Sequence, residues 1–292
     1  MFKAERAVDG ANDTLVAPPA RRIVFRTRGH GHGPITRLMS PGDLGQALKP
    51  FVFLDHFELG KAPGMAMGLH PHSGIATATY LFDGAVRFED TTGERGVLGA
   101  GSLEWFKAAQ GAWHGGGADE TADGARGFQL WLALPGEHEL GAVESRYVQP
   151  GAVPHDGPAA KLIGLDDGSA IQALSPLTYR AVRLKAGQAW RFEPPVGQTL
   201  AWCAVSRGRL LTPETVTAGE MAMFEPAKLE PGAGALDLHA AADTEFVVGS
   251  AAPHPHDLVM GSYSVHTSQA ALAAGEQRIR AVGDQLRAQG RI

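Results

Sequence analysis

The 292-residue sequence predicts an all-β protein built from antiparallel strands. Its 38 glycines and 19 prolines are dispersed, and short apolar or alternating runs recur between turn signals. Helix-length periodicities are scarce, whereas short strands separated by glycine turns are typical of β-sandwiches and β-barrels. A chain of this length is long enough for two medium domains.

The first half of the chain is expected to form one domain at residues 22–140. A polar arm at residues 1–21 precedes it and is expected to be loosely held. Asp83-Gly84 lies between two apolar runs and is a strong hairpin signal. We expect strands in this half at residues 22–28, 51–57, 77–82, 85–89, 97–98, 102–107 and 128–134.

The second half repeats this pattern at residues 161–267, after a linker rich in proline and glycine at residues 141–160. The recurring order of strand, glycine turn and strand indicates an internal duplication. Where the first half has a pair of histidines, this half has Trp190, Phe192 and Pro194. We therefore expect apolar side chains to fill the place in this half that corresponds to the metal site. We expect strands here at residues 161–165, 179–184, 190–193, 200–205 and 221–224.

A single good helix is expected in the C-terminal segment 268–292. Leu272, Ile279, Val282 and Leu286 recur at intervals of seven, three and four residues, with polar residues between them. This spacing places them on one face of a helix. We expect that face to pack against the β-structure.

Composition excludes several classes of function. The formal charge is −5 with mixed signs along the chain, so no basic face is available for direct contact with nucleic acid. The single cysteine, Cys203, lies in an apolar run, which excludes an internal disulfide and indicates a buried thiol in a reducing compartment. No apolar run has the length of a signal peptide or a membrane span. We expect a cytoplasmic protein that does not contact membranes.

Histidines indicate a metal site in the first half. In a strand, residues two apart share a face, so His70 and His72 would present both imidazoles together while Pro71 faces the other way. His114 follows a strand-rich passage long enough to fold back antiparallel. Three neutral nitrogen donors would then converge on one cation.

Other polar residues were weighed as candidates or excluded. His56 ends the strand at 51–57 and could line the same pocket as His70. Glu104 would share the face of Phe106 on its strand, and if that face is inward, Glu104 could serve as a ligand or a general base. Two pairs are expected to lie on surface loops, His30 with His32 and His254 with His256. Asp119 and Glu120 could supply a replacement carboxylate to the metal, but they follow three glycines and are expected to be plain loop charges. Ser73 would point away from His72, which excludes a catalytic pair between them.

Six segments together resemble the pirin family of the cupin superfamily in their order and spacing. The resemblance extends over residues 22–287 and is more specific in the first half. The segments are PFVFLDHF at 50–57, LHPHSG at 69–74, TYLFDG at 79–84, GVLGAG at 96–101, AQGAWH at 109–114 and GFQLW at 127–131.

The resemblance implies a bicupin: two stacked cupin-type antiparallel β-barrels with a C-terminal helix and one mononuclear metal site in the N-terminal barrel. It implies that His70, His72 and His114 bind a divalent metal, typically iron, with nickel, manganese and zinc as alternatives. A glutamate two residues after the third histidine is the family's fourth ligand, and Gly116 stands there in this chain. A second acid of the cupin pattern is replaced by Ala76.

The missing acids leave two functions open. In the first, the three histidines keep the metal, Gly116 leaves room for an anionic oxygen of the substrate, and the protein is a dioxygenase of the quercetin 2,3-dioxygenase type acting on a flavonol, enediol or catechol. In the second, it is a non-catalytic binding or regulatory module with a protein partner and little or no metal. We expect a monomer in both cases.

Overall fold

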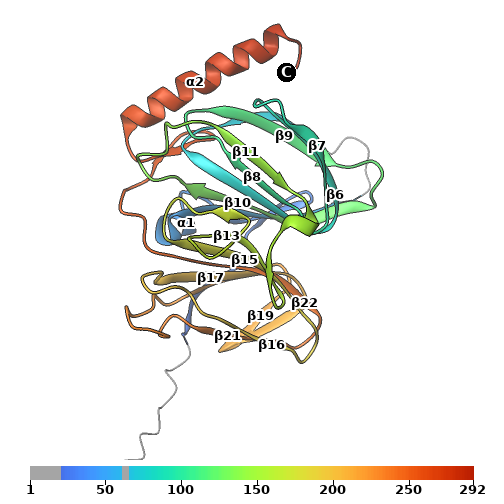
Figure 1. The fold of residues 1–292 in the computed structure, drawn as a ribbon, viewed down its shortest axis with the longest axis vertical. Helices are drawn as coiled ribbons and strands as arrows, with labels where there is room; N and C mark the ends of the chain where they lie inside the picture. The colour runs from blue at the N-terminus through green and yellow to red at the C-terminus, as the bar shows by residue number, and fades with distance from the viewer. Residues whose placement is uncertain (1–20, 61–65) are drawn as a thin grey trace, which may run out of the picture.

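Antiparallel strands form two barrels that are stacked on each other, which confirms the predicted all-β class (Figure 1). The computed structural model describes residues 21–60 and 66–292, so the predicted arm lies outside the described residues except for Arg21. Within these described ranges, helical structure is limited to α1 (Leu44–Leu48), a 3₁₀ turn at Pro150–Ala152 and α2 (Gln269–Ala288). No helix of the described ranges combines the length and apolar character needed to cross a membrane.

The first barrel contains ten strands in one hydrogen-bonded sheet. Most of the strands expected in this half are present, and the pair His30 and His32 forms an exposed edge strand, where we had expected a loop. The strands are β2 (His30–His32), β3 (Ile35–Met39), β4 (Phe51–Gly60), β5 (Ala66–His72), β6 (Ile75–Asp90), β7 (Arg95–Gly99), β8 (Leu103–Lys107), β9 (Ala112–Ala118), β10 (Gly124–Ala133) and β11 (Glu144–Val148).

The predicted hairpin at Asp83-Gly84 is wrong, because β6 runs through both residues as one strand. The first part of β6 pairs with β8 and β10, and its second part pairs with β7 and β9. Gly84 has a φ of +72°, and a Cβ atom there would lie 1.9 Å from the carbonyl oxygen of Gly124. The glycine therefore allows a change of partner strands within β6, where the sequence signal had indicated a turn.

The second barrel combines an eight-stranded sheet with a four-stranded one. The eight-stranded sheet contains β1 (Ile23–Thr27), β12 (His155–Asp156), β13 (Ala159–Gly164), β14 (Ile171–Gln172), β15 (Leu177–Leu184), β17 (Leu200–Arg207), β20 (Glu220–Phe224) and β22 (Thr244–Ala251). The four-stranded sheet contains β16 (Ala189–Phe192), β18 (Arg209–Thr212), β19 (Glu214–Thr217) and β21 (Leu236–Ala240). The interior of this second barrel is an apolar cluster that includes Phe192 and the free Cys203. Burial raises the pKa of the Cys203 thiol to about 12.

The chain crosses between the barrels more often than the sequence pattern indicated. Strand β1, expected in the first barrel, pairs with β20 of the second. Residues 141–160, expected as a linker, contain β11 of the first barrel and β12 of the second. After the second barrel the chain returns through β23 (Val259–Met260) and β24 (Val265–His266) to the first, and α2 packs there on β5, β9 and β24. Each barrel therefore does not correspond to one continuous half of the chain.

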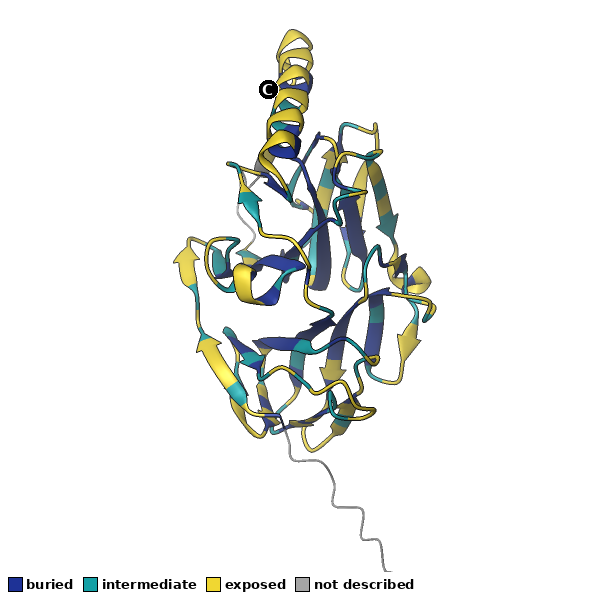
Figure 2. Cartoon of the chain, turned by 90° about the vertical axis from the view of Figure 1, so that its left-hand side faces the viewer, coloured by how far each residue is buried: buried dark blue, intermediate teal, exposed yellow. Residues whose placement is uncertain are grey.

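Buried faces of the two large sheets form the core between the barrels (Figure 2). Phe51 of the first barrel packs edge-on against Trp202 of the second, with ring centroids 5.3 Å apart. Polar groups also meet here: Ser206 accepts a hydrogen bond from Arg126 and lies 2.9 Å from Nε2 of His56. These contacts show that His56 faces the second barrel. Because side chains alternate along a strand, its neighbours Asp55 and Phe57 on β4 face the opposite way.

We expect His56→Gln to reduce the acid sensitivity of the metal-free protein. Burial lowers the pKa of His56 to about 4; Glu58 raises it by a smaller amount, and Arg126 lowers it further. The unfolded chain takes up the proton first, so the stability contributed by neutral His56 is complete above pH 6.5 and is lost as the pH falls toward 4. Between pH 7 and pH 4 the wild type should lose about 3 kcal/mol more than the variant. Urea unfolding of chelator-treated protein measures this, and parallel pH profiles would contradict it.

Candidate metal centre

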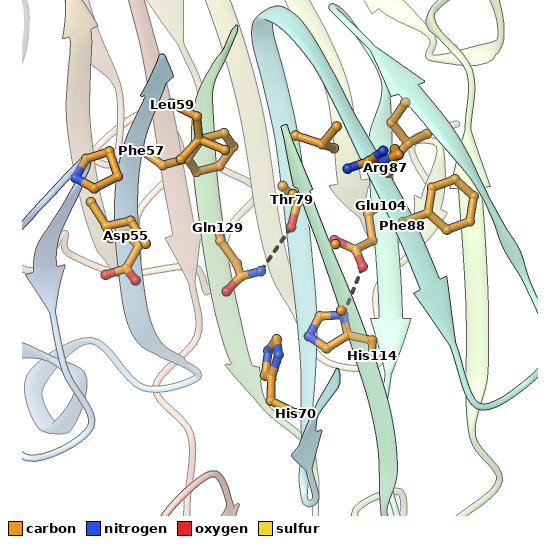
Figure 3. A pocket seen from close by; sticks show the side chains of 17 residues that line it. Asp55, Phe57, Leu59, His70, Thr79, Arg87, Phe88, Glu104, His114 and Gln129 are labelled. Carbon is orange, nitrogen blue, oxygen red and sulfur yellow. Dashed lines mark hydrogen bonds and ion pairs between the residues drawn. The ribbon is translucent and has the colours of Figure 1, made fainter. Parts of the chain in front are cut away.

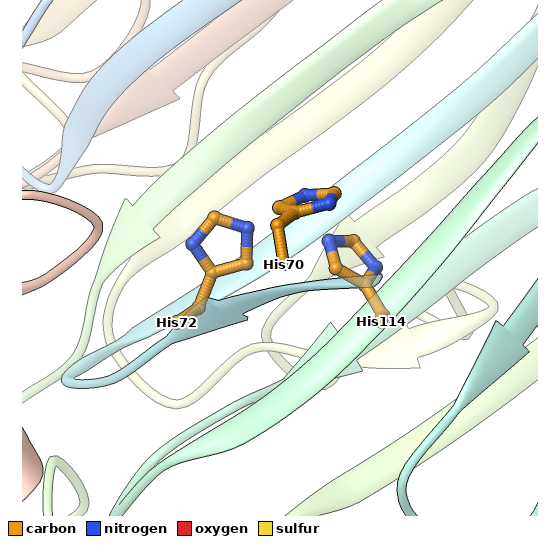
Figure 4. A group of neighbouring side chains, drawn as sticks. All are labelled: His70, His72 and His114. Carbon is orange, nitrogen blue, oxygen red and sulfur yellow. The ribbon is translucent and has the colours of Figure 1, made fainter. Parts of the chain in front are cut away.

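Two neighbouring strands bring the three predicted histidines together (Figure 4). His70 and His72 share one face of β5, and His114 on β9 is the register partner of His70. The ring centroids lie 4.6 to 5.1 Å apart, and one ligand nitrogen of each ring lies within 4.8 Å of the others. In the part of the chain that the structure describes, this is the one group of three or more such side chains with the spacing of a metal site.

Hydrogen bonds determine which nitrogen of each imidazole is available. The Nδ1–H of His70 donates to the carbonyl of Gly68 at 3.0 Å, and that of His72 donates to the carbonyl of Tyr263 at 3.1 Å. Nδ1 of His114 lies 3.0 Å from Oε1 of Glu104, a carboxylate that accepts its proton. Because Nδ1 of each ring is engaged in this way, Nε2 is the nitrogen of each ring that remains for a metal ion.

The free nitrogens fit a metal ion. Nε2 of His72 and Nε2 of His114 are buried and have no hydrogen-bond partner in the structure. A buried polar atom without a partner costs free energy, and a cation between the three rings would satisfy it. Three imidazoles are a ligand set that divalent transition metals accept at bond lengths of about 2.1 Å, so small rotations of the rings would complete the site.

Burial keeps two of these imidazoles in the form that binds metals. It lowers the pKa of His70 to about 4, and the neighbouring His114 lowers it further. The pKa of fully buried His72 lies well below the ordinary value for the same two reasons. Both rings are therefore neutral at neutral pH and need not lose a proton to bind a metal.

Glu104 lies beside the histidines and is ionised. It is 7% exposed on β8, and its carboxylate contacts His114. Burial alone would raise its pKa, but attraction to His114 and hydrogen bonds from His114 and Thr79 outweigh burial and lower it. A carboxylate that accepts the second ring proton of a candidate ligand orients the ring and makes its free nitrogen more basic. The face that Glu104 shares with Phe106 is the inward one, because Phe106 stacks on His114 with centroids 4.4 Å apart.

A cavity of about 270 Å³ opens beside His70 and His114 (Figure 3). One part of its wall is polar: Gln129 donates to Thr79, which neighbours Glu104, and Asp55 lies farther along. The rest is mainly apolar and is formed by Pro34, Ile35, Phe57, Leu59, Val86, Phe88 and Leu98. A flat molecule with polar groups along one edge complements such a wall.

Gly116 does not leave the space that its position in the sequence indicated. A Cβ atom there would lie 2.2 Å from the carbonyl oxygen of Arg87, and one on Gly115 would lie 2.9 Å from the backbone nitrogen of Leu69. These glycines line the cavity at a point where β9 pairs with both β5 and β6. A side chain at position 116 would meet the backbone of β6. The other empty acid position, Ala76, is fully buried in the core.

The remaining candidates lie away from the three histidines. His56 does not line the cavity, which corrects our expectation, because it faces Ser206 of the second barrel. Asp119 bonds within its own turn to Thr121, and Glu120 pairs with Arg87 at the surface. His254, expected on an exposed loop, is 6% exposed with Nε2 3.3 Å from the carbonyl oxygen of Leu134.

Sequence reasoning missed a contact of Ser73. Its side chain does point away from His72, but it meets His266, whose Nε2 lies 3.0 Å from the serine Oγ. Nδ1 of His266 in turn lies 3.2 Å from a carboxylate oxygen of Glu139. No local motif relates residues so far apart in sequence, so only the fold reveals this arrangement.

Sequence comparisons relate the chain to pirin-like proteins. The family model described as Pirin matches residues 34–132. A pirin-like protein of Caulobacter vibrioides is 32% identical over 192 residues, which cover 60% of this chain and 67% of that protein. A Pseudomonas aeruginosa protein provisionally named a quercetin 2,3-dioxygenase is 30% identical over 238 residues, covering 75% of this chain and 81% of that protein.

Solved structures share the fold. The crystal structure of quercetin 2,3-dioxygenase from Acinetobacter baumannii aligns with a TM-score of 0.76 at 22% identity, covering 93% of this chain and 98% of that one. The bacterial pirin YhhW from Escherichia coli, in complex with nickel(II), aligns with a TM-score of 0.60 at 17% identity, covering 80% and 99% of the two chains.

Glu104→Gln should weaken metal binding. The amide keeps the shape and an oxygen that accepts the proton of His114, but it removes the negative charge. We expect roughly a tenfold loss of affinity, as for other outer partners of metal-binding histidines. Competition with a coloured chelator measures it, and Glu144→Gln on the neighbouring β11 is the control, since Glu144 pairs with Lys107 away from the site. Equal affinity in the two variants would show that the Glu104 charge is irrelevant.

Gly116→Glu should not add a ligand. Because its Cβ would collide with the backbone of β6, we expect no gain in metal affinity and a loss of about 2 kcal/mol in stability from overpacking. Gly116→Ala tests the collision alone, and Gly99→Ala is the control, since a Cβ at Gly99 meets nothing within 4 Å. Denaturant unfolding and chelator competition measure the two effects. A tighter-binding Gly116→Glu protein would contradict this account.

Proposed function

Because the chain belongs to the pirin family of the cupin superfamily, we propose that it is a metal-dependent dioxygenase acting on flavonols or on related enediols or catechols. The observation that carries the proposal is the set of three Nε2 lone pairs, each with its Nδ1 proton committed elsewhere, beside a cavity with a polar wall. The names of the Pseudomonas and Acinetobacter relatives support the same class of reaction.

In this proposal His70, His72 and His114 hold a divalent ion, iron in the first instance, with nickel, manganese or zinc as alternatives. When bound, such an ion supplies Lewis acidity toward a substrate oxygen and, if redox-active, the means to engage dioxygen. Three neutral ligands leave its formal charge uncompensated. An anionic oxygen of the substrate is therefore the complementary ligand, and a flavonol or catechol supplies one on losing a hydroxyl proton.

The surrounding residues have separate roles. Glu104 orients His114 and is the candidate acceptor for the hydroxyl proton, since it is ionised and lines the cavity. Gln129 and Thr79 offer hydrogen bonds along the same wall. The apolar side chains, among them Phe57 and Phe88, would enclose an aromatic ring and exclude water. The cavity volume of about 270 Å³ suits one small ligand.

One observation favours the alternative, a non-catalytic binding or regulatory module. Within the described residues no carboxylate belongs to the three-histidine group, so we expect a lower metal affinity than in a site with an acidic ligand. If the protein is empty in the cell, the same cavity would serve a partner or ligand without chemistry.

Metal analysis with oxygen uptake decides between the two functions. We expect the wild type, purified without chelator or affinity metal, to contain about one divalent ion per chain and to consume dioxygen with a flavonol or catechol. In His114→Ala affinity should fall at least about 100-fold, because losing a ligand costs more than losing its outer partner. His256→Ala, on an exposed loop, is the control and should behave as the wild type.

Two results would overturn the dioxygenase proposal. A wild type that contains no metal and takes up none of the four added ions favours the binding module. A fully loaded wild type that consumes no dioxygen with any flavonol or catechol rejects the reaction while leaving the metal site intact.

A further inference from the structure

The segment that follows the second barrel returns to the strand that carries His72. Ser73 comes directly after His72 and faces the other way, toward this returning segment. Its carbonyl accepts a hydrogen bond from the backbone of Val265 at 3.2 Å, and its Oγ lies 2.8 Å from Oγ of Ser264 and 3.0 Å from Nε2 of His266. All of these groups are buried.

Glu139 lies on the other side of His266. One carboxylate oxygen is 3.2 Å from Nδ1 of the ring, within ion-pair distance but without hydrogen-bond geometry. The same carboxylate accepts two hydrogen bonds at 2.7 Å from Thr267, one from the backbone and one from the hydroxyl. With exposures of 0%, 1% and 4%, Ser73, His266 and Glu139 form a buried polar chain, which we call the clamp.

The clamp has the residue order of a nucleophilic triad but cannot act as one. Helix α2 covers it: a Cβ atom on Gly275 would lie 2.5 Å from Oγ of Ser73 and 2.6 Å from Nε2 of His266. No substrate can reach a serine closed off in this way. The contacts therefore join the returning segment to the end of β5 and have no part in nucleophilic chemistry.

One atom links the clamp to the metal centre. The carbonyl of Tyr263, next to Ser264, accepts the Nδ1 proton of His72. A backbone carbonyl can hold an imidazole only as firmly as its own segment is held. We propose that Ser73, His266 and Glu139 are positioning residues, which keep the Tyr263 carbonyl on His72 and so maintain its Nδ1–H tautomer with Nε2 free. This inference rests on the proposed function only in taking His72 as a metal ligand.

Helix α2 makes a similar contact at β9, the strand that carries the candidate ligand His114. Trp113, next to His114, donates its indole proton to the carbonyl of Ile279 at 2.9 Å. A Cβ atom on Gly283 would lie 2.8 Å from the indole ring, so the helix packs against it without a side chain between. Residues adjacent to two of the three candidate ligands are therefore tied to the C-terminal segment. By linkage, metal binding should in turn tighten the docking of that segment.

The test uses the full-length protein and two readouts. Nitrogen NMR of ¹⁵N-histidine-labelled, metal-free protein reports the tautomer of His72, and titration with cobalt(II) reports affinity and coordination through the visible spectrum. In Ser73→Ala we expect the His72 signals to shift from pure Nδ1–H toward a mixture of tautomers. Cobalt affinity should fall about tenfold with an altered spectrum, as for other outer partners of metal ligands.

Two further variants make the result decisive. Ser268→Ala removes the N-cap of α2 without touching the clamp and should keep the tautomer, affinity and spectrum of the wild type. His266→Gln, whose amide can reach Ser73, should restore part of the affinity relative to His266→Ala; if Ser73→Ala does not fold, this pair replaces it. A Ser73→Ala or His266→Ala protein with the wild-type tautomer and cobalt spectrum would overturn the inference.

The outcome is separable from that of the proposed function. If the wild type binds no metal, the NMR readout alone decides, because it needs none. If the wild type binds cobalt and the clamp variants lose affinity, the positioning role stands whether or not the loaded protein consumes dioxygen.

Discussion

Three hydrogen bonds from imidazole Nδ1 atoms are the interaction on which the candidate centre depends. Their acceptors come from three places: Gly68 on the same strand, Glu104 on a neighbouring strand and Tyr263 in the segment after the second barrel. Each bond commits one ring proton and thereby frees one lone pair. Without them the histidines would still lie close together, but the nitrogens that they offer would vary.

Close backbone approach is the condition for this geometry. The strands β5, β6 and β9 meet where glycines leave no Cβ between them, and β6 changes partners at Gly84 without ending. The same close approach that leaves no room for an acidic side chain at position 116 therefore brings β9, with His114, against β5 and β6. In this chain the carboxylate beside the histidines is Glu104, which acts through His114.

The sequence was informative where an effect is local. Alternation placed His70 and His72 on one face, apolar runs predicted most strands, and the spacing of Leu272 and Val282 predicted the final helix, which the structure begins one residue after Ser268. Effects that depend on distant partners were not predictable. The face of β4 that carries His56 could not be known without the second barrel, and the contact of Ser73 with His266 spans 193 residues.

The position of the acid also shapes the chemistry. A carboxylate that bonded the ion directly would cancel one unit of its charge and occupy one of its open positions. Glu104 contacts His114 instead, so it would make a nitrogen donor more basic and leave the charge of a bound ion to be balanced by an incoming group. The cavity lies beside His70 and His114, so an incoming group would enter between its apolar wall and the carboxylate of Glu104. An ion held by His70, His72 and His114 would attract an anionic oxygen that Glu104 repels. A hydroxyl group avoids this repulsion, because it can give its proton to the Glu104 carboxylate. The site thus favours a ligand that enters as an acid and binds as its conjugate base.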